Sequence, residues 1–110
     1  MLTYSNAEQI LKAIGEETRL KIISYLTIDS FCVCELVELL QMSQPSISQH
    51  LRRLRQMEII LEERRGKWIF YSLNKEHELY TLVLHLTSML PSKNDNIQSF
   101  VVEGRRVLCD

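Results

Sequence analysis

Apolar residues recur through the first part of the chain with the spacing of amphipathic helices. A first stripe is formed by Ala7, Ile10, Leu11 and Ile14. A second stripe is formed by Leu20, Ile22, Ile23 and Leu26. Ser5 and Glu8 have the spacing of a capping box at the start of the first helix, and Gly15 is placed to end it. Asp29 and Ser30 follow the second stripe and mark its end, so the pattern predicts two short helices.

Two more helical stripes stand close together in the middle of the chain. One is formed by Val33, Leu36, Val37 and Leu40, and the other by Ile47, Leu51 and Leu54. Ser43 can cap the later helix by accepting a hydrogen bond from a backbone amide of its first turn. Pro45 is tolerated there because the N–H that proline lacks would be unpaired anyway. Two helices joined by a link of about three residues predict a helix-turn-helix.

A β-hairpin is predicted directly after these helices. It begins at Ile59 to Glu62, turns near Arg65 and Gly66, and returns through Trp68 to Tyr71. Gly66 suits the positive φ angle that a tight turn requires. Alternation along the second strand puts Trp68 and Phe70 on one face and Ile69, Tyr71 and Leu73 on the other, where we expect them to pack the hairpin. The fold class is therefore mainly α with a small β-hairpin.

The last helix is predicted to begin at an Asn74 cap and to end before Pro91. Its apolar residues are Leu79, Leu82, Val83, Leu86 and Leu90. This stripe is long for a chain of 110 residues, which suits a single domain with a modest core. We therefore assign it, with Ile10 of the first helix, to a homodimer interface; the alternative is a helix that covers its own core. The domain comprises residues 1–110, with its core at about 5–91 and a tail at 92–110 that the pattern does not place.

The face of the second central helix opposite its apolar stripe carries side chains suited to reading DNA. Glutamine can pair with adenine, arginine with guanine or phosphate, and short hydroxyls with base edges or phosphates. The alternative is a solvated polar face. The basic hairpin that follows favours DNA, while His50, beside the apolar stripe, is expected to pack between helices. The predicted DNA contacts are Gln44, Ser46, Ser48, Gln49, Arg52, Arg53, Arg64, Arg65 and Lys67.

Charge is distributed unevenly along the chain. The net charge is −1, but residues 44–67 hold six basic and three acidic side chains, a local charge of +3. Positive charge is thus concentrated where phosphates would lie. No apolar run approaches the roughly 20 residues of a membrane span, and the N-terminus lacks the pattern of a signal peptide. These features predict a cytoplasmic protein that binds double-stranded DNA and does not enter the membrane.

Three cysteines are too few for a disulfide framework, so free thiols or metal ligands are expected. Cys32 and Cys34 stand at the predicted start of a helix, where the positive end of the helix dipole favours the thiolate. On a regular helix their side chains would diverge by about 200°, so sharing an ion requires a distorted first turn. The alternative is a pair of small buried apolar residues.

Four segments together resemble the ArsR/SmtB family of metal- and metalloid-responsive repressors. They read GEETRLKIISYL, CVCELVELL, SQPSISQHLRRL and RRGKWIFYSLN, and the resemblance covers about Ala7 to Leu90. It implies a homodimeric winged helix-turn-helix repressor that leaves its operator when an inducer binds. The segment CVCEL looks like the arsenic branch, in which Cys32 and Cys34 match the inducer thiols and trivalent arsenic or antimony is the inducer.

Two departures from the family's patterns bear on the inducer. Val37 stands where the best-known arsenic pattern has a third cysteine, and no cysteine precedes Cys32, as the cadmium and lead branch would require. A trivalent ion needs one more sulfur, which Cys109 or a small thiol could supply. The zinc and nickel pattern of the last helix is not matched, so His77 and His85 are expected to be surface or interface residues.

Two other classes of function compete with the metalloid repressor. A thiol-redox repressor on the same scaffold would pair Cys109 with Cys32 or Cys34, because a disulfide within C-x-C would be strained. Another soft-metal response on that scaffold is also open. An enzyme with Cys32 as nucleophile lacks an evident partner acid or histidine and a phosphate-binding loop, so we predict that the protein is not an enzyme.

Overall fold

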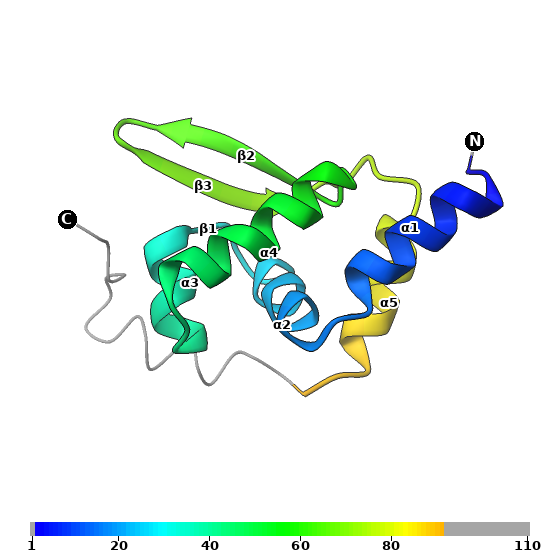
Figure 1. Ribbon diagram of the computed structural model, residues 1–110, viewed down its shortest axis with the longest axis horizontal. Coiled ribbons are helices and arrows are strands. Elements are labelled where there is room, and N and C mark those ends of the chain that lie inside the picture. The colour runs from blue at the N-terminus through cyan, green and yellow to red at the C-terminus, as the bar shows by residue number, and fades with distance from the viewer. Residues whose placement is uncertain (1, 92–110) are drawn as a thin grey trace.

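The computed structural model describes residues 2–91, which form helices around a small three-stranded sheet (Figure 1). In chain order the elements are α1 Tyr4–Ile14, α2 Glu17–Leu26, β1 Phe31–Cys32, α3 Val33–Leu40, α4 Gln44–Gln56, β2 Ile60–Arg65, β3 Trp68–Leu73 and α5 Tyr80–Ser88. The helix α4 runs across the front of the molecule, and the β2–β3 hairpin extends beyond it at the upper left. No helix of the described part is long and apolar enough to cross a membrane.

The central helices and their turn confirm the predicted helix-turn-helix. Gln41 ends α3 in a left-handed conformation with φ 54°, and its amide donates to the Val37 carbonyl at 2.8 Å. Ser43 then caps α4, where its hydroxyl accepts from the Ser46 amide at 3.3 Å. The apolar side of α4 is fully buried: its residues Ile47, Leu51 and Leu54 are at most 1% exposed. Hydrophobic burial of this stripe therefore fixes which face of α4 points outward.

The sheet contains one strand that the sequence did not predict. The hairpin forms as expected, with Gly66 at φ 63° in its turn, but β1 adds a third strand and gives the order β1-β3-β2. Phe31 lies opposite Tyr71 and Cys32 opposite Phe70. A strand of two residues is too short to show an alternating pattern in the sequence. It forms only because β3, some forty positions later in the chain, supplies its pairing partners.

Two helix starts differ from the sequence prediction. The cap of α1 is Thr3, whose hydroxyl accepts from the Asn6 amide at 3.0 Å, so the capping box expected at Ser5 is wrong. Asn74 does not cap α5, which begins at Tyr80. The Asn74 side chain instead donates to the Glu58 carbonyl at 2.9 Å and accepts from the Glu76 amide at 3.1 Å. Asparagine thus stabilises a turn here, a role that competes with helix capping.

One hydrophobic core contains residues of all five described helices, and α4 lies at its centre. Ile10 of α1 and Val83 of α5 are 7% and 3% exposed and belong to the same cluster as the α4 stripe. Tyr25 and Phe31 meet edge to face with ring centroids 6.3 Å apart. Because α4 packs on α1, α2, α3 and β2, its outer face is held rigidly in place.

Candidate nucleic-acid interface and thiol site

The outer face of α4 offers the side chains that the sequence assigned to DNA. Gln49 and Arg52 are exposed, while Ser46 and Ser48 are half-buried beside them. The Gln44 amide donates to the Ser48 hydroxyl at 3.1 Å, so these two predicted contacts bond to each other in the unbound protein. A helix whose N-terminal turns carry amide and hydroxyl side chains is suited to entering a major groove.

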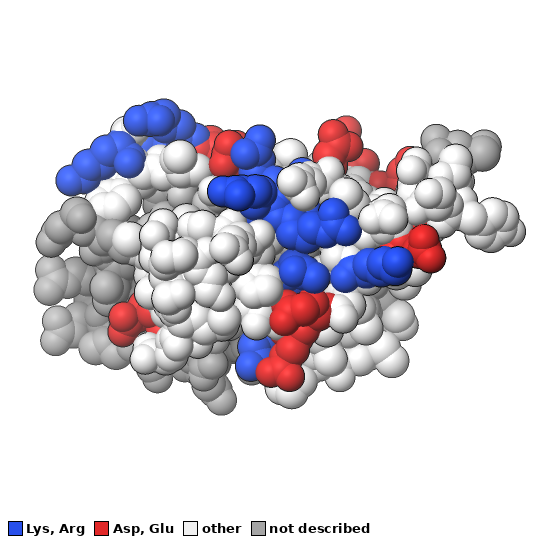
Figure 2. All heavy atoms as spheres, viewed as in Figure 1, with Lys and Arg blue, Asp and Glu red and all other residues white. Residues whose placement is uncertain are grey.

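The tip of the hairpin is basic and exposed. Arg64, Arg65 and Lys67 all face solvent, and Figure 2 shows Lys and Arg side chains gathered over this tip and over α4. The Arg65 guanidinium lies 4.6 Å from the Phe70 ring centroid, and the Lys67 ammonium lies 5.1 Å from that of Trp68. Each cation therefore makes a cation–π contact with an aromatic ring of β3.

Polar contacts between elements hold α4 in place, and the sequence did not predict most of them. Arg53 donates to the Gln9 side chain of α1 at 3.4 Å, and Arg55 forms an ion pair with Glu62 of β2 at 2.9 Å. Arg53 is half-buried, so its guanidinium is less available to DNA than that of exposed Arg52. Residues far apart in sequence make these contacts, so no local pattern signals them.

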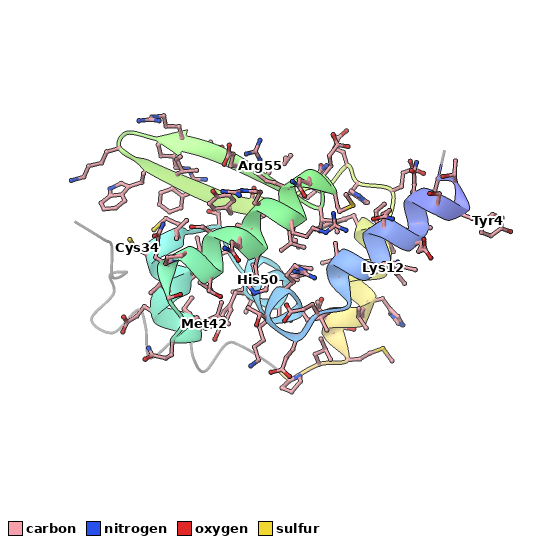
Figure 3. All side chains as sticks on the ribbon, viewed as in Figure 1. Tyr4, Lys12, Cys34, Met42, His50 and Arg55 are labelled. Atoms are coloured by element: carbon pink, nitrogen blue, oxygen red, sulfur yellow. The ribbon has the colours of Figure 1, made fainter. Side chains whose placement is uncertain are left out.

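His50 lies on the inner side of α4, as expected of a packed histidine (Figure 3). Its Nδ1 is 3.2 Å from Arg19 Nη1 and 3.6 Å from a Glu16 carboxylate oxygen. Arg19 also donates to the Ala13 carbonyl, so one guanidinium joins the end of α1 to α4. Burial tends to raise the pKa of Glu16, but hydrogen bonds from the Arg19 and Thr18 amides and the nearby His50 and Arg19 lower it overall.

Cys32 is a buried thiol at the junction of the sheet and α3. It is 2% exposed, and its backbone amide donates to the Glu35 carboxylate at 3.0 Å in a capping-box arrangement. Burial raises the pKa of the Cys32 thiol, and the charge of Glu35 raises it further. The expectation that the helix N-terminus lowers the pKa of this thiol is therefore wrong for Cys32, because desolvation and an adjacent carboxylate outweigh the dipole.

Glu35 is the residue of this site that the sequence prediction missed. It is 0% exposed, yet it lies in a helix whose other buried residue is apolar. A signal was present in the sequence: a Glu three residues after a cap position is the second half of a capping box. Cysteine is not a usual cap, and for that reason the pattern went unrecognised.

Cys34 lies two residues after Cys32, in the first turn of α3, and is half-buried. It is disulfide-bonded in this structure, so any role as a metal ligand requires its reduction. Cys32 belongs to β1 and is the N-cap of α3 with extended backbone angles, so the two cysteines stand at the helix start, as predicted, but do not lie on one regular helical turn. The third predicted ligand, Cys109, lies outside the described residues. Within residues 2–91, no three His, Cys, Asp or Glu side chains group as a metal site would require.

The two histidines of the last segment have different settings. His77 is half-buried; its Nε2 lies 3.1 Å from the Met57 carbonyl, and its Nδ1 accepts from the Leu79 amide at 3.0 Å. This pairing assigns the proton to Nε2 and fastens the loop before α5 to the end of α4. His85 is exposed on α5.

The residues assigned to the dimer interface divide into two groups. Ile10 and Val83 are buried within a single subunit, as described above, so they stabilise its own core. Leu82 and Leu86 remain 48% and 37% exposed, and Met89, the C-cap of that helix, is 72% exposed. Leu79 and Leu90 are half-buried. The apolar side chains that α5 leaves exposed are therefore Leu82, Leu84 and Leu86.

A helix-turn-helix with an exposed polar outer face, followed by a basic hairpin that packs on it, defines a winged helix-turn-helix DNA-binding protein. Residues 16–61 match the family described as bacterial regulatory proteins of the arsR family. The structure is similar to HlyU from Vibrio cholerae, with a TM-score of 0.71 and 30% identity over 78% of this chain and 92% of that one. It is also similar to the transcriptional repressor BigR from Xylella fastidiosa, with a TM-score of 0.71 and 31% identity over 78% and 84% of the two chains.

Curated relatives agree with the structural neighbours. An arsenic resistance transcriptional regulator of Pseudomonas putida is 35% identical over 77% of this chain and 79% of its own length. The arsenical resistance operon repressor of Escherichia coli is 42% identical over 60% of this chain and 57% of its own length. The chain belongs to the ArsR family. It is a DNA-binding transcriptional repressor of that family, and the relatives named above are regulators rather than enzymes.

Proposed function

We propose that this repressor leaves its operator when trivalent arsenic or antimony binds the Cys32 and Cys34 thiolates. The observation that supports the proposal most directly is the position of Cys32. Its backbone caps α3, the first helix of the helix-turn-helix, and pairs with Phe70 in the hairpin. A ligand that displaces this one residue therefore disturbs both DNA-binding elements. A repressor acts where the chromosome lies, so the proposal includes a cytoplasmic location.

The donor set suits a trivalent thiophile better than a divalent ion. The two thiols stand two residues apart, and soft ions prefer thiolates. A tetrahedral site for zinc or cadmium would need four ligands, whereas a pyramidal trivalent ion needs one sulfur beyond these two. We propose that Cys109 or a small cellular thiol supplies it.

The buried state of Cys32 makes the switch a conformational one. Its thiol is protonated and held in the core, because burial and Glu35 raise its pKa. Coordination requires the thiolate and access to the Cys34 sulfur, so Cys32 must leave its place between Glu35 and the sheet. This movement breaks the hydrogen bond from the Cys32 amide to Glu35 and the pairing with Phe70. Induction then lowers DNA affinity by distorting the start of α3 and loosening the wing.

Thermodynamic linkage sets how strong the effect is expected to be. If the inducer weakens operator binding, operator DNA must weaken inducer binding by the same factor. Coupling between two sites in a protein is typically about 1 to 3 kcal/mol, or roughly 5- to 150-fold. The same factor should therefore be obtained from inducer titrations with and without operator DNA.

Cysteine variants test the inducer site. We expect Cys32→Ser and Cys34→Ser each to bind the operator but to remain bound at an arsenite concentration that releases the reduced wild-type protein. Serine keeps the volume of the side chain and removes the soft ligand. Operator binding measured by fluorescence anisotropy, with and without arsenite, gives the result. Cys109→Ser tests the third ligand, because it loses release by arsenite only if Cys109 supplies the third sulfur.

The outcome that contradicts the metalloid site is release of the Cys32→Ser, Cys34→Ser double variant by the same arsenite concentration.

A second candidate, a thiol-redox repressor, is favoured by the disulfide at Cys34. The same assay separates the two candidates when the reduced protein is treated with peroxide in place of arsenite. Only if oxidation is the signal does peroxide release the operator, and mass spectrometry then shows that a disulfide has formed.

We propose that α4 and the wing contact DNA through the residues assigned from the sequence. Exposed Gln49 and Arg52 would read the major groove, and exposed Arg64, Arg65 and Lys67 would contact phosphates. The partial burial of Arg53, which bonds to Gln9, gives it a smaller share in binding.

Loss of the wing charges should weaken binding to every DNA sequence. Replacing both Arg65 and Lys67 by Ala is expected to reduce the slope of log affinity against log salt by about one unit for each lost phosphate contact. Lys75→Ala is the control, because Lys75 is exposed in the loop before α5, outside the hairpin. Salt titration of operator binding measures the slope, and an unchanged slope in the double variant would exclude the wing from the interface.

We also propose that the repressor is a homodimer, with the exposed side of α5 at its centre. Leu82, Leu86 and Met89 lie on one side of that helix and face solvent in a single subunit. Two large apolar side chains exposed on one side of a nine-residue helix, with a third at its C-cap, form a patch that is unusual for an isolated domain. Two subunits would also place two α4 helices against paired half-sites, which raises DNA affinity.

A further inference from the structure

An ion pair connects the recognition helix α4 to the wing. Arg55 Nη1 of α4 lies 2.9 Å from a Glu62 carboxylate oxygen of β2. Tyr71 of β3 lies directly opposite Glu62 in the β2–β3 pairing, so its side chain is a cross-strand neighbour of the same carboxylate. We call Arg55, Glu62 and Tyr71 the latch; Figure 3 labels Arg55, which lies between α4 and the hairpin.

The latch occupies the middle of the sheet. Glu62 lies directly opposite Tyr71 in the β2–β3 pairing, and Tyr71 lies opposite Phe31 in the β1–β3 pairing. Cys32 is the residue after Phe31 and lies opposite Phe70. A displacement of β1 by ligand binding at Cys32 therefore reaches Tyr71 through one strand pairing and Glu62 through the next.

Neither folding stability nor attraction to DNA explains why Arg55 is paired with a carboxylate on the wing. Arg55 is 52% exposed and Glu62 33% exposed, and partly exposed ion pairs contribute little to folding stability. A carboxylate beside a basic surface also repels phosphate and cancels part of the Arg55 charge. Burial raises the pKa of the Tyr71 hydroxyl, and the neighbouring charge of Glu62 raises it further.

We propose that Arg55, Glu62 and Tyr71 are positioning residues that hold the wing at the angle to α4 required for operator binding. Arg55 supports operator binding by holding Glu62 of the wing, and it does not itself contact a phosphate. Release of the latch lets the hairpin move relative to α4, so that major-groove and phosphate contacts are no longer made together. The regulatory part of this inference, that the inducer site acts through the latch, rests on the proposed function; the positioning part does not.

Two neighbouring glutamates on β2 provide a matched test. Glu62→Gln and Glu63→Gln remove the same charge from the same strand, and both carboxylates pair with an arginine, Arg55 at 2.9 Å and Arg65 at 2.7 Å. Simple electrostatics predicts that both changes tighten DNA binding. The latch predicts opposite signs: Glu63→Gln, which frees the exposed Arg65, binds the operator more tightly, and Glu62→Gln binds it roughly three- to tenfold more weakly, a range typical of coupled networks.

A comparison between operator and random-sequence DNA excludes a general loss of fold. Glu62→Gln is expected to bind random DNA at least as tightly as the wild-type protein, since the loss concerns the joint placement of α4 and wing. Tyr71→Phe, which changes no charge and keeps the ring, is expected to lose operator affinity in the same direction. The double variant Arg55→Gln, Glu62→Gln should bind the operator no more weakly than the weaker single variant.

The positioning role is overturned if Glu62→Gln tightens operator binding as Glu63→Gln does, or if Tyr71→Phe leaves it unchanged. The regulatory role is tested separately with arsenite. We expect Tyr71→Phe to bind arsenite with the wild-type stoichiometry and to show a smaller drop in operator affinity on binding. An undiminished drop overturns the regulatory role. If the wild-type protein shows no release by arsenite, the proposed function fails while the positioning result stands.

Discussion

A Leu82→Glu variant is expected to sediment as a monomer and to lose most of its operator affinity. Leu82 is 48% exposed in a single subunit, so the substitution does not disturb the core of that subunit. In the proposed dimer it would bury a carboxylate against the apolar side of a second α5. An unpaired buried charge costs several kcal/mol, enough to dissociate a small dimer. Loss of the second subunit also removes contacts to one of the two half-sites.

Thr81→Glu is the matched control for the dimer. Thr81 is exposed on the same helix, but its side chain points about 100° away from that of Leu82. Analytical ultracentrifugation and thermal unfolding should show that Thr81→Glu remains a dimer and that both variants are folded. A Leu82→Glu protein that stays dimeric and binds a palindromic site would remove this side of α5 from the interface.

A Leu54→Ala variant is expected to lose about 2 to 5 kcal/mol of unfolding free energy, the range for leucine truncation in a closed core. Leu54 is 0% exposed and belongs to the core cluster that joins α4 to the other helices. The cavity would lie directly behind the recognition helix, so operator affinity should fall with stability. Urea unfolding followed by circular dichroism measures the change in free energy.

Leu61→Ala provides the comparison for this loss. Leu61 is 49% exposed on β2, so the same truncation removes little buried surface and should change stability by less than about 1 kcal/mol. Equal losses in the two variants would mean that the α4 stripe is not the centre of the core.

Much of the fold could be predicted because the relevant signals are local. The stripe of Ile47, Leu51 and Leu54 identifies both α4 and its buried face, and Ser43 marks where that helix begins. Gly66 marks the hairpin turn by the one backbone conformation that favours glycine. The predicted start of α5 is wrong because an Asn side chain can stabilise either a helix start or a turn. Here the Asn74 side chain donates to the Glu58 carbonyl and stabilises a turn.

The candidate sites were predicted as residues but not as environments. Residue types and spacing indicated thiols at Cys32 and Cys34 and cations on α4 and the hairpin. They did not indicate that Cys32 is buried against Glu35, which raises the pKa of its thiol. The pKa depends on desolvation and on neighbouring charges, and both follow from packing across the chain.

The sequence by itself determined the helix-turn-helix, the hairpin and the sign of the charge on their outer surface, since each follows from periodicity, caps and turn residues within a short segment. Only the tertiary structure decided which neighbour covers each apolar or polar face. It assigned Ile10 and Val83 to the core while leaving Leu82 exposed, and it brought Arg55 of α4 to Glu62, the cross-strand partner of Tyr71. The physical reason is that a pattern reports which side of an element avoids water, whereas strand register and helix packing choose the partner that meets it.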